Sequence, residues 1–302
     1  MQKKTEIIGW SSLLFWITLG IILFFLLPYF KNMFYNPDNA KSWLERLKQE
    51  ELIVQDTTQI PVDTTQQPIN NIYITWAWED YHGSHHEIGF NINSLDTVKA
   101  IDFRKSYSQS AEISQLYYDF IRVSSAPLDS MCSSLMSDIR KKGLLGQDVL
   151  DYVVSAIQYP TYTKITPNVE CPCFDMGRNW SKDCLPKEDG TGCCNLVYPI
   201  GVYTPTEFIY KKTGDCDTKA LIAYALLKKI GYKSALLLGQ VSGGYHAMLG
   251  LTEVNPVIPS RYVRHNNRVY YPWEVTGDYN GDCRLGNMNM WPVWNNWRVV
   301  CD

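Results

Sequence analysis

The chain has little excess of either charge, because 28 lysine and arginine residues nearly balance 31 aspartate and glutamate residues. The formal net charge is -3, so no basic field is present to attract a phosphate backbone, and nucleic acid is excluded as an expected partner. Internal repeats are lacking, and low complexity is confined to one short stretch rich in Thr, Gln and Pro. Repeat architectures are thereby excluded. A chain of 302 residues with 45% hydrophobic residues can bury a full core, which predicts a globular protein.

Charged side chains are absent altogether from Ile7 to Phe30, a run long enough to cross a bilayer as a helix. We expect an uncleaved transmembrane helix, because the run exceeds the apolar core of a signal peptide and no small-x-small cleavage site follows it. Residues 1–6 are then a cytoplasmic tail and residues 31–70 a juxtamembrane helix and linker. Lysines on both sides of the span leave the topology open by charge alone.

Nine cysteines all lie after this span, and five of them crowd between Cys171 and Cys194. If Cys216 is set aside as a reactive thiol, an even set remains that four disulfides could use in an oxidising compartment. That set is Cys132, Cys171, Cys173, Cys184, Cys193, Cys194, Cys283 and Cys301. Cys283 with Cys301 is the one pairing that we expect. A structural zinc site in residues 171–194 is the alternative, although its spacing lacks paired CxxC motifs.

Alternating aromatic and polar residues from Ile72 to Asn93 predict a β-hairpin with its turn near residues 81–84. His82, His85 and His86 lie at this turn, so a metal site has to be considered. Polar side chains that face solvent beside a turn are the commoner case, and we expect no metal here.

Helical periodicity in residues 111–123 and 128–157 predicts a helical layer. We expect a small N-terminal region, made of the hairpin and helices, at residues 71–145. A catalytic domain is expected at residues 146–302. Residues 160–199 are rich in loops and cysteines, which predicts a disulfide-stapled insertion in that domain.

Cys216 stands at the start of a strongly helical run, whose apolar stripe over residues 218–230 ends at Gly231. Free backbone N–H groups and the macrodipole at a helix N-terminus favour a thiolate and lower the pKa of the thiol. We therefore expect Cys216 to be a nucleophile at neutral pH. Asp215 and Asp217 would oppose thiolate formation if they pointed at the sulfur, so we expect them to cap the helix or to pair with lysines.

Three strands are expected after this helix, and two of them carry polar groups that suit cysteine chemistry. They are Lys233–Val241, Tyr245–Leu251 and Arg268–Val275. His246 opens the second strand and Glu274 lies in the third. A nucleophilic cysteine needs a base to take its proton and an acid to orient that base, which are the roles of His246 and Glu274. Each residue taken singly is weak evidence, because buried cysteines and strand histidines are usually structural.

Three blocks of sequence resemble the cysteine, histidine and acid blocks of the transglutaminase-like superfamily. They are GDCDTKALIAYALLKKIGYKSALLL, GGYHAMLGL and VYYPWEVTG. The resemblance spans Tyr198 to Met288 and implies a papain-like fold, in which a central helix packs against an antiparallel sheet. It also implies that Cys216 is the nucleophile, His246 the general base and acid, and Glu274 the orienting carboxylate, with no cofactor. The family's acid is usually aspartate, so Asp278 is the fallback.

The expected fold class is therefore α+β, a papain-like core with an N-terminal transmembrane helix and a small accessory region of hairpin and helices. The expected function is a membrane-anchored extracytoplasmic cysteine enzyme that cleaves or transfers an amide acyl group of a protein or peptide through a thioester. A peptidase or amidase is favoured over a cross-linking transferase, and the bilayer is contacted through residues 7–30. The alternatives are a non-catalytic binding or assembly module on the same scaffold, and a structural ectodomain in which Cys216 forms a disulfide. Besides the backbone N–H of Cys216, no second oxyanion donor is assigned.

Overall fold

The structure is a computed structural model, and the part of it described below belongs to one compact unit that begins at Gln66. The described residues are 70–108, 112–167, 194–241, 244–252, 254, 261–276 and 295–302. The expected transmembrane helix, the juxtamembrane helix and linker, and most of the cysteine-rich insertion lie outside these residues.

Helices form most of the described chain between residues 94 and 230. They are α3 (Ser94–Ser106), α4 (Ile113–Val123), α5 (Ser125–Lys142), α6 (Gln147–Gln158), α7 (Pro205–Lys211) and α8 (Cys216–Ile230). The helical layer expected over residues 111–123 and 128–157 is confirmed by α4, α5 and α6. α5 and α8 each end at a left-handed glycine, Gly143 and Gly231, as helices that stop sharply commonly do.

The expected hairpin is confirmed by β1 (Asn71–Glu79) and β2 (His85–Asn93), which pair antiparallel. Its alternating pattern buries one face, which carries Trp76, Trp78 and Phe90. That face packs against α5 and α6, and the Trp76 indole donates to the carbonyl of Ala156 at 3.0 Å. The hairpin is thus built into the core, because its apolar face would otherwise be exposed to water.

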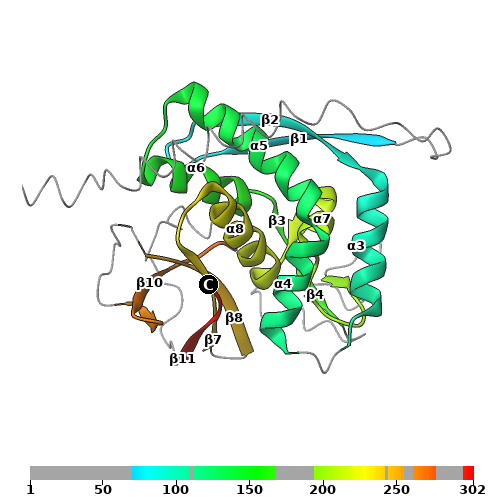
Figure 1. Cartoon of the computed structure of the whole chain (residues 1–302), viewed down its shortest axis with the longest axis vertical. Coiled ribbons are helices and arrows are strands. Elements are labelled where there is room, and N and C mark those ends of the chain that lie inside the picture. The colour runs from blue at the N-terminus through cyan, green and yellow to red at the C-terminus, as the bar shows by residue number, and fades with distance from the viewer. Residues whose placement is uncertain are drawn as a thin grey trace, which may run out of the picture. The chain divides into compact units, whose positions relative to one another are not determined.

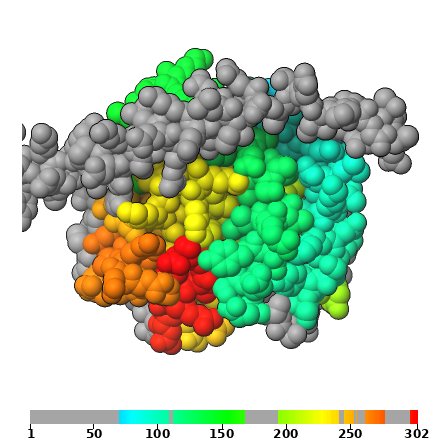
Figure 2. Space-filling view, viewed as in Figure 1, coloured from blue at the N-terminus to red at the C-terminus, as the bar shows by residue number. Residues whose placement is uncertain are grey.

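The described residues after α8 form a five-stranded antiparallel sheet in the order β11-β7-β8-β10-β9. Its strands are β7 (Ser234–Val241), β8 (Gly244–Leu251), β9 (Val263–His265), β10 (Arg268–Trp273) and β11 (Asn295–Cys301). The sheet curls until its edge strands β9 and β11 come near each other. Figure 2 shows β11 at the surface, between α4 and the segment that carries β9 and β10.

Two short parallel strand pairs join the helical part to the segment that leads into α8. One pairs β3 (Thr161–Tyr162) with β6 (Thr213–Gly214), and the other pairs β4 (Lys164–Thr166) with β5 (Cys194–Leu196). β6 ends directly before α8. These pairs therefore fix the backbone from which Cys216 emerges.

α8 lies at the centre of the described unit (Figure 1). It contacts β7 and β8 of the sheet as well as α4, α5, α6 and α7. Most of its side chains are buried, among them Leu221, Ile222 and Leu226. A helix that is buried on most sides is held by tertiary packing, so its first turn has a fixed position.

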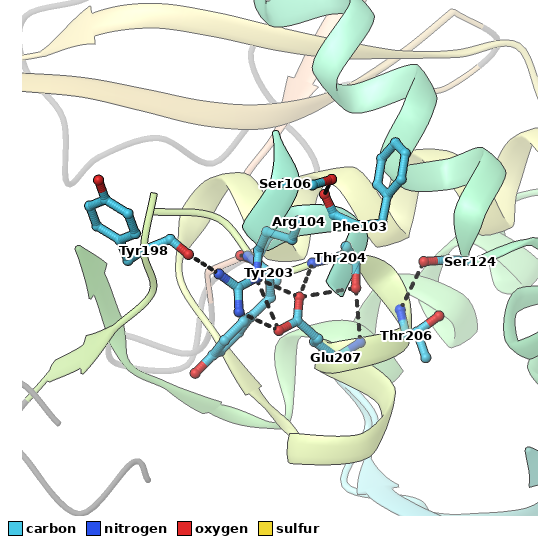
Figure 3. Close-up of polar contacts among 10 residues, drawn as sticks. Phe103, Arg104, Ser106, Ser124, Tyr198, Tyr203, Thr204, Thr206 and Glu207 are labelled. Carbon is cyan, nitrogen blue, oxygen red and sulfur yellow. Dashed lines mark hydrogen bonds and ion pairs between the residues drawn. The ribbon is translucent and has the colours of Figure 1, made fainter. Parts of the chain in front are cut away.

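A buried ion pair joins two helices that are distant in sequence, as Figure 3 shows. Arg104 on α3 donates from Nε and Nη2 to the Glu207 carboxylate on α7, each at 2.9 Å, and from Nη1 to the Tyr198 carbonyl at 2.6 Å. Glu207 also accepts from the backbone N–H of Thr204, whose hydroxyl caps α7 in return. The reciprocal hydrogen bonds of Thr204 and Glu207 form a capping box at the start of this helix.

The fold class expected from the sequence is wrong. Among the described residues no helix is long and apolar enough to cross a bilayer. Those residues form a mixed α/β unit, in which the hairpin and α3 to α6 belong to one body with α7, α8 and a five-stranded sheet curled toward closure. The expected papain-like core with a small accessory region does not describe this arrangement. The reason is that the hairpin's tryptophans are part of the common core.

The expected use of the cysteines is also wrong. Cys132, Cys216 and Cys301 carry thiols, whereas Cys194 is disulfide-bonded. The set of four disulfides and the pairing of Cys283 with Cys301 therefore do not hold. The alternative in which Cys216 forms a disulfide is excluded on the same ground.

Candidate active site

Cys216 is the first residue of α8, and its sulfur faces the neighbouring strand β8. The backbone N–H of Ala247, the residue after His246, donates toward this sulfur. The turn from β6 into the helix requires a glycine, because a Cβ on Gly214 would lie 2.9 Å from Phe208 and from Thr218. This close approach explains the glycine two residues before Cys216, because it brings the start of α8 against Phe208 of α7.

His246 and Glu274 are in direct contact, as the sequence predicted. His246 Nε2 lies 2.7 Å from Glu274 Oε2, and the two residues are only 6% and 7% exposed. Glu274 follows the end of β10, and its other oxygen accepts from the Thr276 backbone N–H at 2.9 Å and from the Thr276 hydroxyl at 2.7 Å. Both carboxylate oxygens are thus engaged. The fallback acid Asp278 lies outside the described residues.

The surroundings of Glu274 keep it ionised in spite of its burial. Burial acts to raise the pKa of this carboxyl, but the charge and hydrogen bond of His246 and the donors of Thr276 outweigh it. The net effect holds the pKa of Glu274 below its ordinary value of 4.5. The Glu274 carboxylate fixes the His246 ring through Nε2, so Nδ1 is the nitrogen that can exchange a proton elsewhere.

The expectation of a lowered thiol pKa at Cys216 is wrong. Burial is the largest influence and raises the pKa of this thiol well above its usual range, and the neighbouring Asp217 and Asp215 raise it further. The Ala247 N–H acts in the opposite direction but does not outweigh them. Cys216 therefore rests as a neutral thiol at pH 7, and any reaction requires a base to take its proton.

Asp215 and Asp217 hold protons more tightly than ordinary carboxyl groups do. Burial, followed by the charge of Asp217, raises the pKa of Asp215 well above the usual range, and burial also raises that of Asp217. Asp215 occupies the N-cap position of α8, yet its side chain makes no capping hydrogen bond. Its Oδ2 accepts from the Ile165 backbone N–H at 3.3 Å, whereas Oδ1 has no hydrogen-bond partner within the described part of the chain.

Aromatic side chains enclose the histidine and the glutamate. The Trp297 ring meets the His246 ring edge-on, with centroids 6.4 Å apart and planes at 87°. Gly239, the cross-strand partner of His246, gives the indole room, since a Cβ there would collide with the Trp297 ring. Trp273, the residue before Glu274, is fully buried and stacks on Tyr81 with ring centroids 6.4 Å apart.

Sequence reasoning missed several residues around this site. Burial raises the pKa of the Tyr162 phenol on β3 far above its usual range. A negative charge on the nearby Cys216 would raise this pKa further. Lys219, Gln158 and Thr276 form hydrogen bonds to the Glu274 segment. The one available signal was Lys219 itself, a charged residue within the apolar stripe of a buried helix.

The hairpin histidines form contacts with protein groups. His86 Nε2 lies 2.8 Å from Asp80 Oδ2, and Lys142 Nζ lies 3.1 Å from His86 Nδ1. Asp80 also accepts from the backbone N–H groups of His82 and Ser84, which closes the turn. No group of three metal-ligating side chains is found in the described ranges.

Comparisons of the chain with protein-family models, with curated proteins and with solved structures gave no match. The resemblance to transglutaminase-like blocks therefore stays a prediction that rests on the residues themselves.

Proposed function

We propose that this protein is a cysteine enzyme that cleaves or transfers an amide acyl group through a thioester on Cys216. The observation that carries the proposal is the buried contact of His246 with Glu274 at 2.7 Å, on the strand whose next N–H donates toward the Cys216 sulfur. A base held by a charged acid and lying beside a nucleophile is the arrangement that acyl transfer requires.

The raised pKa of the Cys216 thiol makes His246 a general base in this mechanism. Nδ1 takes the thiol proton as the sulfur attacks the amide carbon, and the S–C bond forms. Glu274 stabilises the resulting imidazolium. The backbone N–H of Cys216 at the start of α8 faces the developing oxyanion. His246 then returns the proton to the nitrogen as the C–N bond breaks and the amine leaves.

The resemblance to transglutaminase-like blocks supports a protein or peptide as the substrate. Water that attacks the thioester gives a peptidase or amidase, which we favour, whereas an amine acceptor gives a transferase. Analysis of products in the presence and absence of an added primary amine separates the two reactions. Incorporation of the amine at the expense of the free acid is the outcome that contradicts the hydrolase assignment.

Labelling with a thiol-directed electrophile tests the proposal. We expect iodoacetamide to label Cys216 in preference to Cys132 and Cys301, because the Cys216 sulfur faces the strand that carries His246 and accepts from the N–H of the next residue, Ala247. Burial raises the pKa of Cys301 to about 12, so it serves as an internal control within the same chain. The proposal fails if peptide mapping finds no preference for Cys216, or if Cys216→Ala retains full activity.

The raised thiol pKa favours one other candidate, a non-catalytic binding or assembly module. Such a module does not need the thiol, so Cys216→Ala should capture the same partners as the wild type. Loss of binding in Cys216→Ala, or formation of an acyl adduct in the wild type, argues against it.

A further inference from the structure

We propose that Lys219 is a positioning residue that ties the Glu274 segment to the helix carrying Cys216, and so holds Glu274 in register with His246. The inference rests on the proposed function, because it gives Lys219 its role through the acid and base of that mechanism. It adds a fourth side chain to the site, at a position that the sequence blocks do not mark as functional.

Lys219 lies one turn after Cys216 on α8, and its side chain is completely buried, with 0% exposed. Its ammonium donates to the backbone carbonyl oxygens of Gln158 at 2.8 Å, Pro160 at 2.5 Å and Thr276 at 3.1 Å. These three acceptors come from the end of α6, from the loop after it and from the segment after β10. One side chain on α8 thus joins two segments that are distant in sequence.

Both of these segments also hold Glu274. The Gln158 amide donates to the Glu274 carbonyl at 2.6 Å, and Thr276 donates twice to Glu274 Oε1. The ammonium of Lys219 donates hydrogen bonds to the backbone carbonyl oxygens of both Gln158 and Thr276. Loss of these hydrogen bonds therefore releases the two residues that hold Glu274. Gln158 holds its backbone carbonyl, and Thr276 holds its Oε1.

The cost of burying an ammonium indicates that Lys219 does more than fill space. An apolar side chain would suit the stripe formed by the other buried residues of α8, without the penalty of desolvating a charge. Three carbonyl oxygens arranged around the ammonium offset that penalty only in this geometry. The lysine therefore constrains the relative positions of α8, α6 and the Glu274 segment more strictly than a packed leucine or methionine would.

Several titratable groups interact electrostatically with the Glu274 carboxylate. They are His246 on β8, Cys216 on α8 and Tyr162 on β3. Of these, His246 favours the charged carboxylate, whereas a thiolate at Cys216 would oppose it. Donors from Thr276 favour it as well. Release of Thr276 in a Lys219 variant is expected to move the titration of Glu274 to higher pH, because the carboxylate then loses hydrogen bonds.

The test compares Lys219→Met with Lys229→Met. Lys229 is also on α8, but it pairs with Asp129 of α5 at 2.5 Å and, within the described residues, forms no hydrogen bond to the Glu274 segment. We expect iodoacetamide labelling of Cys216 to slow by about tenfold in Lys219→Met, the scale of a misplaced acid-base group. The acid limb of the labelling profile should move to higher pH. Lys229→Met should match the wild type. An unchanged profile in folded Lys219→Met overturns the proposal.

A second readout separates this inference from the proposed function. NMR titration of the ¹³C-labelled Glu274 carboxyl does not require a reactive thiol, so it tests the role of Lys219 even if Cys216 proves inert. We expect the titration to move to higher pH in Lys219→Met. Should that variant not fold, Thr276→Val removes the hydroxyl donor alone and is expected to shift the titration in the same direction. No shift in Thr276→Val overturns the proposal.

Discussion

The Cys216 sulfur is subject to two opposing influences. A helix N-terminus stabilises a negative charge by about 0.3–1 kcal/mol, and by up to about 2 kcal/mol when partly buried. The Cys216 side chain is partly buried, and its desolvation, which disfavours the charged form, is the largest influence on the pKa of the thiol. Burial therefore decides the protonation state of Cys216, and the flanking carboxyl groups act in the same direction.

Asp217→Asn is expected to raise the reactivity of Cys216. Asp217 is the larger of the two charge effects that raise the pKa of the thiol, so its neutralisation should lower that pKa. The rate of alkylation at neutral pH should rise by about threefold to tenfold, and the profile should extend to lower pH. Asp215→Asn is the matched control. Asp215 has the smaller of the two charge effects on the thiol, so its amide variant should change the rate less; a larger effect of Asp215→Asn contradicts the account.

Glu274 should make the stability of the protein depend on pH in the acid range. Its folded-state pKa lies below the ordinary value of 4.5, so its contribution is fully present above pH 4.5 and is lost as pH falls through the folded-state pKa. Urea unfolding of Glu274→Gln should therefore differ most from the wild type above pH 4.5. The exposed Glu87→Gln should stay within about 0.5 kcal/mol of the wild type throughout. A difference between Glu274→Gln and the wild type that grows toward acid pH has the wrong sign for this account.

Among the secondary-structure elements, those with strong local patterns were predictable from the sequence. The hairpin, α8 and the strands β7, β8 and β10 follow from alternation or from a helical stripe. α3 did not, because only Thr97, Ala100 and Arg104 of its residues are buried and no apolar stripe marks it. α7 is short and buries Glu207. Such elements are stabilised by a distant ion pair, which no local pattern reports.

Arg104→Met is expected to destabilise the protein by about 3–5 kcal/mol, because it leaves the buried Glu207 carboxylate without its partner. The side chains of Arg104 and Glu207 are 6% and 1% exposed. Arg122→Met breaks the pair with Asp119 on α4, where the arginine side chain is 72% exposed, and should cost less than about 1 kcal/mol. Chemical denaturation measures both variants. Equal losses in the two variants would mean that the α3–α7 ion pair does not join these helices.

Gly239→Ala is expected to disturb the enclosure of His246. The added methyl group would collide with the Trp297 ring and displace it from β7, at a cost of about 1–3 kcal/mol. Gly250→Ala on β8 is the control, since its methyl group would lie 3.0 Å from the Leu237 side chain, a milder approach than that of the Gly239 methyl group to the Trp297 ring. Tryptophan fluorescence and thermal unfolding report the difference. An unchanged Trp297 environment in Gly239→Ala contradicts the packing described above.

For the molecule as a whole, the nearness of His246 and Glu274 was predictable, because strand spacing in the sequence already set them on neighbouring strands. The fold class was not. The sequence gives no measure of how far the hairpin is buried, and this burial joins the expected accessory region to the core. The protonation of Cys216 was missed for the same reason, since desolvation depends on segments that are remote in sequence. Lys219 likewise acquires its role only when α6 and the segment after β10 meet around it.

Acylation by p-nitrophenyl acetate, followed by peptide mass spectrometry, tests the central claim most directly. The account predicts an acetyl group on the peptide that contains Cys216. Acetylation should be slowed by about a hundredfold or more in His246→Ala and to a smaller extent in Glu274→Gln. Lys229→Met should be acetylated at the wild-type rate. Acetylation that misses Cys216, or that proceeds equally fast without His246, contradicts the claim that this cysteine acts as a nucleophile assisted by His246 and Glu274.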